Sequence, residues 1–132
     1  MGRNTFETVI GFDCEWPYSK PVYVLSNTLK TLPEQVAGKV ELMQGSPHDV
    51  VKELNQKGYT DIYVDGGKTV QKFLQEGLID EMVITTIPIL LGGGVSLFSY
   101  LGNPIKFSLL KNNVYLDSLV QSHYEKLAAN LG

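Results

Sequence analysis

Apolar positions along the chain follow two different spacings, and each spacing predicts one kind of element. Runs of alternating, β-branched or aromatic residues predict strands, which are expected at residues 21–26, 39–43, 61–65, 80–90, 106–115 and 119–126. Apolar residues three or four positions apart predict helices, which are expected at residues 2–9, 46–57 and 67–76. Strands and helices therefore alternate through the first two thirds, and antiparallel strands follow. This order predicts an α/β sheet covered by helices, with an antiparallel edge.

Cap residues define several of the expected helix ends. Ser46 is followed three positions later by Asp49, which predicts a capping box, and Gly58 is expected to end that helix. Asn4 or Thr5 is expected to cap the first helix, because a short polar side chain can accept a bond from a first-turn amide.

Two further local features are expected near the end of the chain. The sequence VSLF at residues 95–98 predicts a single helical turn. The turn between the last two strands is expected either at Asn112-Asn113 or at residues 116–118.

The size and composition of the chain limit the classes of protein that it fits. The 132 residues fit one domain spanning residues 1–132, and the 43% hydrophobic content is enough for a core. A net charge of −3 argues against a nucleic-acid binder, which would show a basic stripe. Cys14 is the single cysteine, so neither an intrachain disulfide nor a cysteine-based metal cluster is expected. The polar N-terminus and the short apolar runs predict a cytoplasmic protein with no membrane segment.

Two glycines separate a predicted strand from a predicted helix in the stretch YVDGGKTV, residues 63–70. The first amides of a helix have no acceptor within it, and the helix dipole places partial positive charge there. Because glycine has no Cβ, Gly66 and Gly67 would let a phosphate approach the backbone, and Lys68 or Thr69 would add a cation or a hydroxyl. The alternative is an ordinary tight turn, and this motif alone leaves both interpretations open.

Two other stretches have a similar character. The N-terminal MGRNT places Gly2, Arg3 and Thr5 at the start of the first predicted helix, where a guanidinium suits phosphate contact. A mobile N-terminus is the alternative interpretation. Leu90 to Gly94, LLGGG, leaves a strand end without side chains, and ligands of α/β sheets lie outside the carboxyl ends of strands. A flexible loop is the alternative there.

Other polar and aromatic residues are interpreted structurally. Neither His48 nor His123 has partners at a metal-ligand spacing, so no metal site is predicted, and no residue is identified as catalytic. Asp65 is expected to cap the helix that follows the glycines. Trp16 and Tyr18 are expected to pack against the core.

The order of these stretches resembles the dihydrofolate reductase-like superfamily, nearest the reductase domain of bacterial riboflavin-biosynthesis deaminase–reductases. The matching stretches cover essentially the whole chain and are MGRNTFE, PVYVLSN, YVDGGKTVQKFLQEGLIDEMVITTIPILLGGGVSLF and SHYEK. The resemblance implies a three-layer αβα fold in which a mixed sheet has helices on both faces and an antiparallel C-terminal edge. Relatives usually carry a further N-terminal stretch with a central strand, and we expect this chain to lack it.

The resemblance also implies NADPH as the cofactor. The residues that would contact it are Gly2, Arg3, Thr5, Ser26, Asn27, Gly66, Gly67, Lys68, Thr69, Leu91, Gly92 and Gly93. By the resemblance, Gly2, Arg3 and Thr5 would hold phosphates. Ser26 and Asn27 would lie near the 2′-phosphate or adenosine, and Gly66, Gly67, Lys68 and Thr69 would cradle the pyrophosphate. Leu91, Gly92 and Gly93 would border the nicotinamide and substrate. Because Asn27 stands where the family often has a basic residue, Arg3 is the main candidate cation for the 2′-phosphate.

The function implied by the resemblance is NADPH-dependent hydride transfer to a pyrimidine- or pterin-type small molecule. The aminouracil reductase of riboflavin biosynthesis, which acts on 5-amino-6-(5-phosphoribosylamino)uracil, is favoured over dihydrofolate reductase. A non-catalytic nucleotide-binding module and a structural oligomer subunit remain alternatives. Relatives are usually dimers, so a homodimer is expected, with no nucleic-acid or membrane partner.

Overall fold

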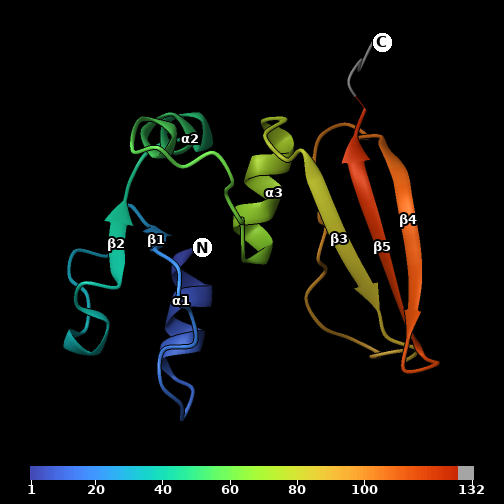
Figure 1. The fold of residues 1–132 in the computed structure, drawn as a ribbon, viewed down its shortest axis with the longest axis horizontal. Coiled ribbons are helices and arrows are strands. Elements are labelled where there is room, and N and C mark those ends of the chain that lie inside the picture. The colour runs from blue at the N-terminus through green and yellow to red at the C-terminus, as the bar shows by residue number, and fades with distance from the viewer. Residues whose placement is uncertain (128–132) are drawn as a thin grey trace. The chain divides into compact units, whose positions relative to one another are not determined.

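The computed structural model describes residues 1–127 and has a mixed α/β fold with one parallel and one antiparallel sheet (Figure 1). The chain divides into two compact units, Met1–Glu76 and Gly77–Gly132. The expectation of a single domain over residues 1–132 therefore stays a prediction. No helix within residues 1–127 is long and apolar enough to cross a bilayer.

The first unit combines a small parallel sheet with three α-helices. Its elements are α1 (Arg3–Ile10), β1 (Val22–Leu25), the 3₁₀ helix η1 (Glu34–Val36), β2 (Val40–Met43), α2 (Pro47–Gln56) and α3 (Gly67–Gln75). β1 and β2 pair in parallel, with Val22 opposite Val40. Gly2 forms a parallel bridge with Leu25, whose amide donates to the Met1 carbonyl at 2.9 Å. The chain entering α1 therefore lies alongside β1.

One hydrophobic cluster of this unit brings together residues of α1, η1 and the parallel sheet. Phe6, Val24, Val36 and Val40 form one buried cluster, in which each fully buried side chain contributes about 1.5–3 kcal/mol. Trp16 packs against this cluster and meets the Phe6 ring edge-on at a centroid distance of 5.9 Å. The prediction that Trp16 packs against the core is confirmed.

The capping box of α2 is present as predicted. The Asp49 amide donates to Ser46 Oγ at 3.2 Å, and the Ser46 amide donates to Asp49 Oδ2 at 3.1 Å. The hydrogen bond from the Ser46 backbone holds the pKa of the Asp49 carboxyl below its usual value. Gly58 follows the helix with a φ of +94°, a conformation that favours glycine at a helix end.

The predicted caps of the first helix are wrong. The N-cap residue of α1 is Gly2, and no side chain accepts a hydrogen bond there. Asn4 and Thr5 lie inside the first turn of α1. The reason is tertiary, because pairing of the preceding residues with β1 fixes where the chain enters the helix.

The predicted strand at residues 61–65 is also wrong, because this segment belongs to neither sheet. A strand needs a hydrogen-bonded neighbour, and no strand within residues 1–127 pairs with this segment. Tyr63 is 90% exposed as a consequence. The β-branched and aromatic pattern of the segment therefore does not suffice to make a strand.

The second unit contains an antiparallel sheet of β3 (Glu81–Thr86), β4 (Phe107–Tyr115) and β5 (Leu119–Lys126), in the order β3-β5-β4. The turn between β4 and β5 lies at residues 116–118, which is one of the two positions predicted from the sequence. Leu116 and Asp117 have φ values of 52° and 55°, and the Ser118 amide donates to the Tyr115 carbonyl at 3.0 Å. The alternative turn at Asn112-Asn113 is wrong, because both residues lie within β4.

Two predictions for the segment between β3 and β4 are wrong. β3 ends at Thr86, which pairs with Val120, close to where the partner strand begins at Leu119. Pro88, which has no amide hydrogen, lies just beyond, so the strand does not reach residue 90. Residues 95–98 form no helical turn, since an isolated turn gains too few hydrogen bonds to offset its entropy.

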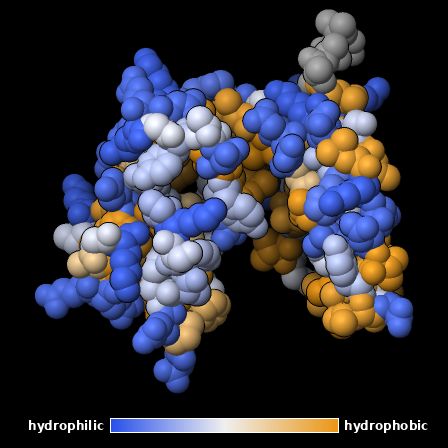
Figure 2. All heavy atoms as spheres, viewed as in Figure 1, coloured by the Kyte–Doolittle hydropathy of each residue, from blue (hydrophilic) through white to orange (hydrophobic). Residues whose placement is uncertain are grey.

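The two faces of the antiparallel sheet differ in polarity. Cross-strand partners share a face, and one face carries Ile84, Leu109, Val114 and other apolar side chains from all three strands. Val114 is 65% exposed on this face. Figure 2 shows hydrophobic residues on the surface of this unit. The homodimer stays a prediction.

Candidate functional site

The N-termini of α1 and α3 meet through a reciprocal pair of glycine–threonine contacts. In each helix, glycine is the N-cap residue and threonine is the third helical residue. A Cβ placed on Gly2 would lie 2.5 Å from Thr69 Oγ1, and a Cβ placed on Gly66 would lie 2.6 Å from Thr5 Oγ1. Since carbon and oxygen atoms that are not bonded do not approach this closely, a side chain at either position would force the threonine to move, which favours glycine at both.

Gly67 differs from these two glycines. Within residues 1–127, no atom other than those of its chain neighbours and of the adjoining helix backbone lies within 4 Å of the position that its Cβ would occupy. The sequence predicts the same role for Gly2, Gly66 and Gly67, which is to let a phosphate approach the backbone. The structure gives Gly2 and Gly66 a different reason, which is contact with a threonine of the other helix. Gly66 also has a φ of +99°, which favours glycine. The open side of Gly67 is where a ligand can approach the backbone.

The helix starts supply hydrogen-bond donors and partial positive charge. No N-cap side chain accepts a hydrogen bond at the start of α1 or α3, so no cap of this kind satisfies their first-turn amides. Two helix dipoles place positive potential near the same residues. Lys68 lies in the first turn of α3 and is exposed. An anionic group suits this arrangement.

Asp65 does not cap α3, so that prediction is wrong: the N-cap position is occupied by Gly66, with no side-chain hydrogen bond. The Asp65 carboxylate interacts instead with the Tyr18 hydroxyl. Burial raises the pKa of Tyr18, and the negative charge and hydrogen bond of Asp65 raise it further. Burial lowers the pKa of the Met1 amine, and Asp65 partly opposes that effect.

A second polar cluster lies where β1 ends. Ser26 Oγ accepts hydrogen bonds from the amides of Thr28, at 3.2 Å, and Leu29, at 2.9 Å. Arg3 Nη1 donates to Thr28 Oγ1 at 2.8 Å. Ser26 Oγ and Thr28 Oγ1 are 3.4 Å apart. The structure therefore brings the predicted residues Arg3 and Ser26 together through one intervening hydroxyl.

Thr28 is the residue of this cluster that the sequence-based interpretation missed. The signal that could have found it is a hydroxyl residue two positions after a strand-terminating serine, which is the spacing of a local side-chain turn. Asn27 is exposed between them. Its predicted role at the adenosine stays a prediction.

Leu91, Gly92 and Gly93, predicted to border the nicotinamide, belong to the second unit. They follow β3 in a segment without regular structure, and Leu91 is exposed. Gly92 has a φ of +75°, so glycine is favoured there by the backbone itself. Their role at the cofactor stays a prediction.

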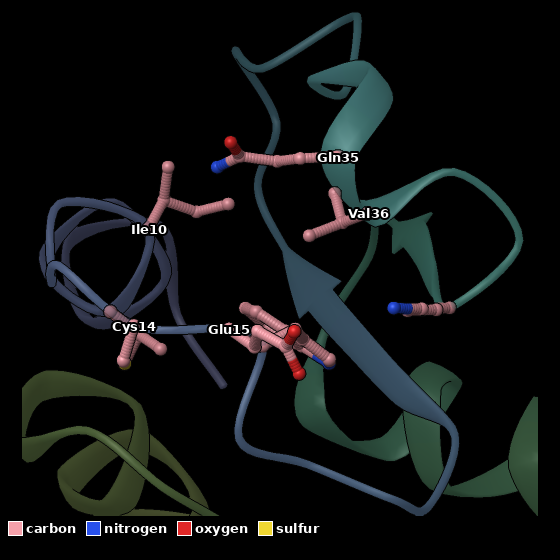
Figure 3. A pocket seen from close by; sticks show the side chains of 8 residues that line it. Ile10, Cys14, Glu15, Gln35 and Val36 are labelled. Carbon is pink, nitrogen blue, oxygen red and sulfur yellow. The ribbon is translucent and has the colours of Figure 1, made fainter.

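A pocket of about 370 Å³ lies at the opposite end of α1 from the glycines (Figure 3). Its lining comes from the end of α1, the following loop, η1 and the segment between η1 and β2. The lining residues are Val9, Ile10, Cys14, Glu15, Trp16, Gln35, Val36 and Lys39. Among residues 1–127, the buried Trp16 Nε1 has no hydrogen-bond partner. None of the residues predicted to bind the cofactor lines this pocket. Within the part of the chain that the structure describes, no group of three His, Cys, Asp or Glu side chains is arranged to hold a metal ion.

Comparison with known proteins identifies related chains. A family profile described as the RibD C-terminal domain matches residues 12–120. The uncharacterized protein YwjB of Bacillus subtilis (strain 168) is 32% identical over 126 residues, which cover 94% of this chain and 70% of YwjB. A crystal structure from Shewanella sp. PV-4, of a protein provisionally named for riboflavin biosynthesis, is 54% identical with a TM-score of 0.93. That match covers 96% of this chain and 72% of the Shewanella chain.

More distant solved structures share the fold. RibD of Acinetobacter baumannii is 22% identical with a TM-score of 0.63, over 96% of this chain and 45% of that chain. A pyrimidine reductase-like protein of Corynebacterium diphtheriae is 18% identical with a TM-score of 0.62, over 81% of this chain and 50% of that chain. The predicted mixed α/β fold with antiparallel C-terminal strands is confirmed, and so is the resemblance to riboflavin-biosynthesis reductase domains.

Proposed function

Because this chain belongs to the RibD C-terminal domain family, we propose that it is an NADPH-dependent reductase of the riboflavin-biosynthesis type. The proposed substrate is an aminopyrimidine or pterin-type molecule, with the ribosylated aminouracil phosphate of riboflavin biosynthesis as the first candidate. Membership of the family supports the reductase class, and the geometry of the first unit supports a dinucleotide.

The observation that carries the proposal is the meeting of the α1 and α3 N-termini beside the open Gly67. A dinucleotide has a doubly charged pyrophosphate, which needs several amide donors and close access to the backbone. The first turns of both helices offer such donors. Among the described residues, no atom beyond the chain neighbours and helix backbone of Gly67 lies within 4 Å of the place of its Cβ, which leaves that access open. The residues present therefore fit the pyrophosphate.

The proposed binding residues divide into two groups. The pyrophosphate would be bound by the amides of residues 67–69, the Lys68 ammonium and the Thr69 hydroxyl, together with the first turn of α1. At the 2′-phosphate, Arg3 and Ser26 would act with Thr28, which already contacts Arg3.

The chain's own contribution to catalysis is proposed to be positional. NADPH, when bound, supplies a hydride to the substrate carbon. Holding both reactants in a reactive arrangement removes much of the entropic barrier, and a closed site excludes water. No side chain of this chain is assigned as proton donor.

The proposal is tested by titrating the chain with NADPH and by following NADPH absorbance with two substrates, the aminouracil phosphate and dihydrofolate. Oxidation with the aminouracil phosphate supports the proposal. Oxidation with dihydrofolate alone identifies a dihydrofolate reductase instead. Binding without oxidation identifies a nucleotide-binding module, and failure to bind NADPH contradicts the proposal.

A further inference from the structure

Arg3 is held between a carboxylate and a hydroxyl on the surface of the first unit. Its Nε donates to Glu7 Oε1 at 2.7 Å, and its Nη1 donates to Thr28 Oγ1 at 2.8 Å. The two ion-paired side chains are 43% and 52% exposed, so solvent and ligands reach both of them. A guanidinium has five N–H groups, and these contacts use two of them. The terminal nitrogens thus keep donors for a further anion.

We propose that Glu7 sets the preference of this chain between nucleotides with and without a 2′-phosphate. This inference rests on the proposed function, because it concerns the cofactor site assigned there. Glu7 acts through Arg3 in two opposed ways. It orients the guanidinium toward Thr28, and its negative charge disfavours a phosphate that approaches the same guanidinium.

The orienting effect follows from the helix. Glu7 is four residues after Arg3 in α1, a spacing that places the two side chains on one face. The carboxylate binds Nε, and this contact directs the other edge of the guanidinium toward Thr28 and the end of β1. A neutral acceptor at position 7 can make the same hydrogen bond, so orientation does not require the charge.

The charge effect depends on the ligand. A phosphate with a charge between −1.5 and −2 is repelled by the carboxylate, whereas a ribose hydroxyl can donate a hydrogen bond to it. At a separation of about 6 Å in a surface site, Coulomb's law with salt screening gives roughly a threefold to eightfold change in affinity for the phosphorylated ligand. Glu7 therefore lowers the selectivity for the 2′-phosphate that Arg3 provides.

The experiment compares Glu7→Gln with the unmodified chain by calorimetric titration of 2′,5′-ADP and 5′-AMP, which differ by the 2′-phosphate alone. The amide keeps an acceptor for Arg3 Nε and removes the charge. We expect the affinity for 2′,5′-ADP to rise roughly threefold to eightfold, and the gain to shrink in high salt. The affinity for 5′-AMP is expected to stay the same or to fall.

Two further variants separate charge from position. Glu34→Gln makes the same change of net charge at an exposed residue of η1, and should leave the ratio of the two affinities unchanged. Glu7→Ala removes both the charge and the contact with Arg3, so its gain for 2′,5′-ADP should be smaller than that of Glu7→Gln. Thermal unfolding of each variant confirms that the fold is retained.

The outcomes distinguish this inference from the proposed function. If NADPH binds and Glu7→Gln changes neither affinity, or changes both by the same factor, the inference is overturned while the proposed function stands. If Glu34→Gln gives the same gain, the effect is one of net charge and the inference is again overturned. If NADPH and both nucleotides fail to bind the unmodified chain, the proposed function itself fails.

Discussion

Thr5 of α1 contacts Gly66 at the start of α3 so closely that its hydroxyl occupies the space where a side chain on Gly66 would lie. Thr69 and Gly2 make the same contact in the reverse direction. These four residues fix two helix N-termini beside each other. The amides of the two first turns can therefore act on one anion, which a single helix start would bind more weakly.

Replacing Gly67 with valine tests the open side of the helix start. A branched side chain there would occupy the space through which a pyrophosphate reaches the backbone. Its Cβ would contact no other part of the described chain beyond the adjoining helix backbone. We expect NADPH affinity to fall at least tenfold, which corresponds to about 1.4 kcal/mol, with little change in melting temperature. Unchanged affinity in a titration would contradict the phosphate assignment.

Replacing Gly2 with alanine tests the contact between the helices. The backbone of Gly2, with a φ of −81°, accepts alanine, but the new methyl group would lie 2.5 Å from Thr69 Oγ1. We expect a loss of about 1–3 kcal/mol in unfolding free energy, as for other overpacked sites. Thr69→Ala removes the clashing oxygen, so the double variant should recover part of that loss. Strictly additive effects in chemical denaturation would show that the two residues do not interact.

Replacing Ser46 with alanine removes one half of the capping box of α2. The Asp49 amide then loses its acceptor at the N-terminus of the helix. We expect a loss of about 1 kcal/mol in unfolding free energy, measured by denaturant titration. Ser46→Thr keeps the hydroxyl and serves as the matched control, with a smaller loss. A loss of equal size in both variants would mean that the hydroxyl has no capping role.

Tyr23 makes the stability of the first unit sensitive to alkaline pH. Its hydrogen bond with Tyr59, together with burial and nearby carboxylates, raises the pKa of Tyr23 from 10.0 to about 12. The unfolded chain therefore loses this proton at a lower pH than the folded chain, and stability should fall as the pH rises from about 10 to about 12. Above that range the contribution is lost and the dependence on this group ends.

The measurement is the unfolding free energy as a function of pH for Tyr23→Phe and for the unmodified chain. The variant should show a weaker decline over the same interval. Tyr115→Phe, at an exposed tyrosine of the second unit, is the matched control and should follow the unmodified chain. A Tyr23→Phe curve that runs parallel to that of the unmodified chain would rule out the titration of Tyr23 as the cause.

Much of the local structure was determined by residues close together in the sequence. The capping box of Ser46 and Asp49 lies within four residues, and the prediction of this motif is confirmed. The strand at residues 119–126 also follows from alternation, whereas the sequence left two positions open for the turn before it. Such features depend on bonds within a few residues, so the order of amino acids contains what is needed to predict them.

Tertiary structure decided the features that depend on distant partners. The segment at residues 61–65 has a strand-like sequence and still forms no strand, because pairing requires a neighbour that its own residues cannot supply. Gly66 and Gly67 are chemically identical neighbours, and folding distinguishes them: Gly66 has a φ of +99° and faces Thr5, whereas Gly67 has an open side. Thr28 joins the site because folding brings it to Arg3, which is 25 residues earlier in the chain. The sequence by itself determined which groups are present and how each local segment bends, whereas folding determined which of these groups meet.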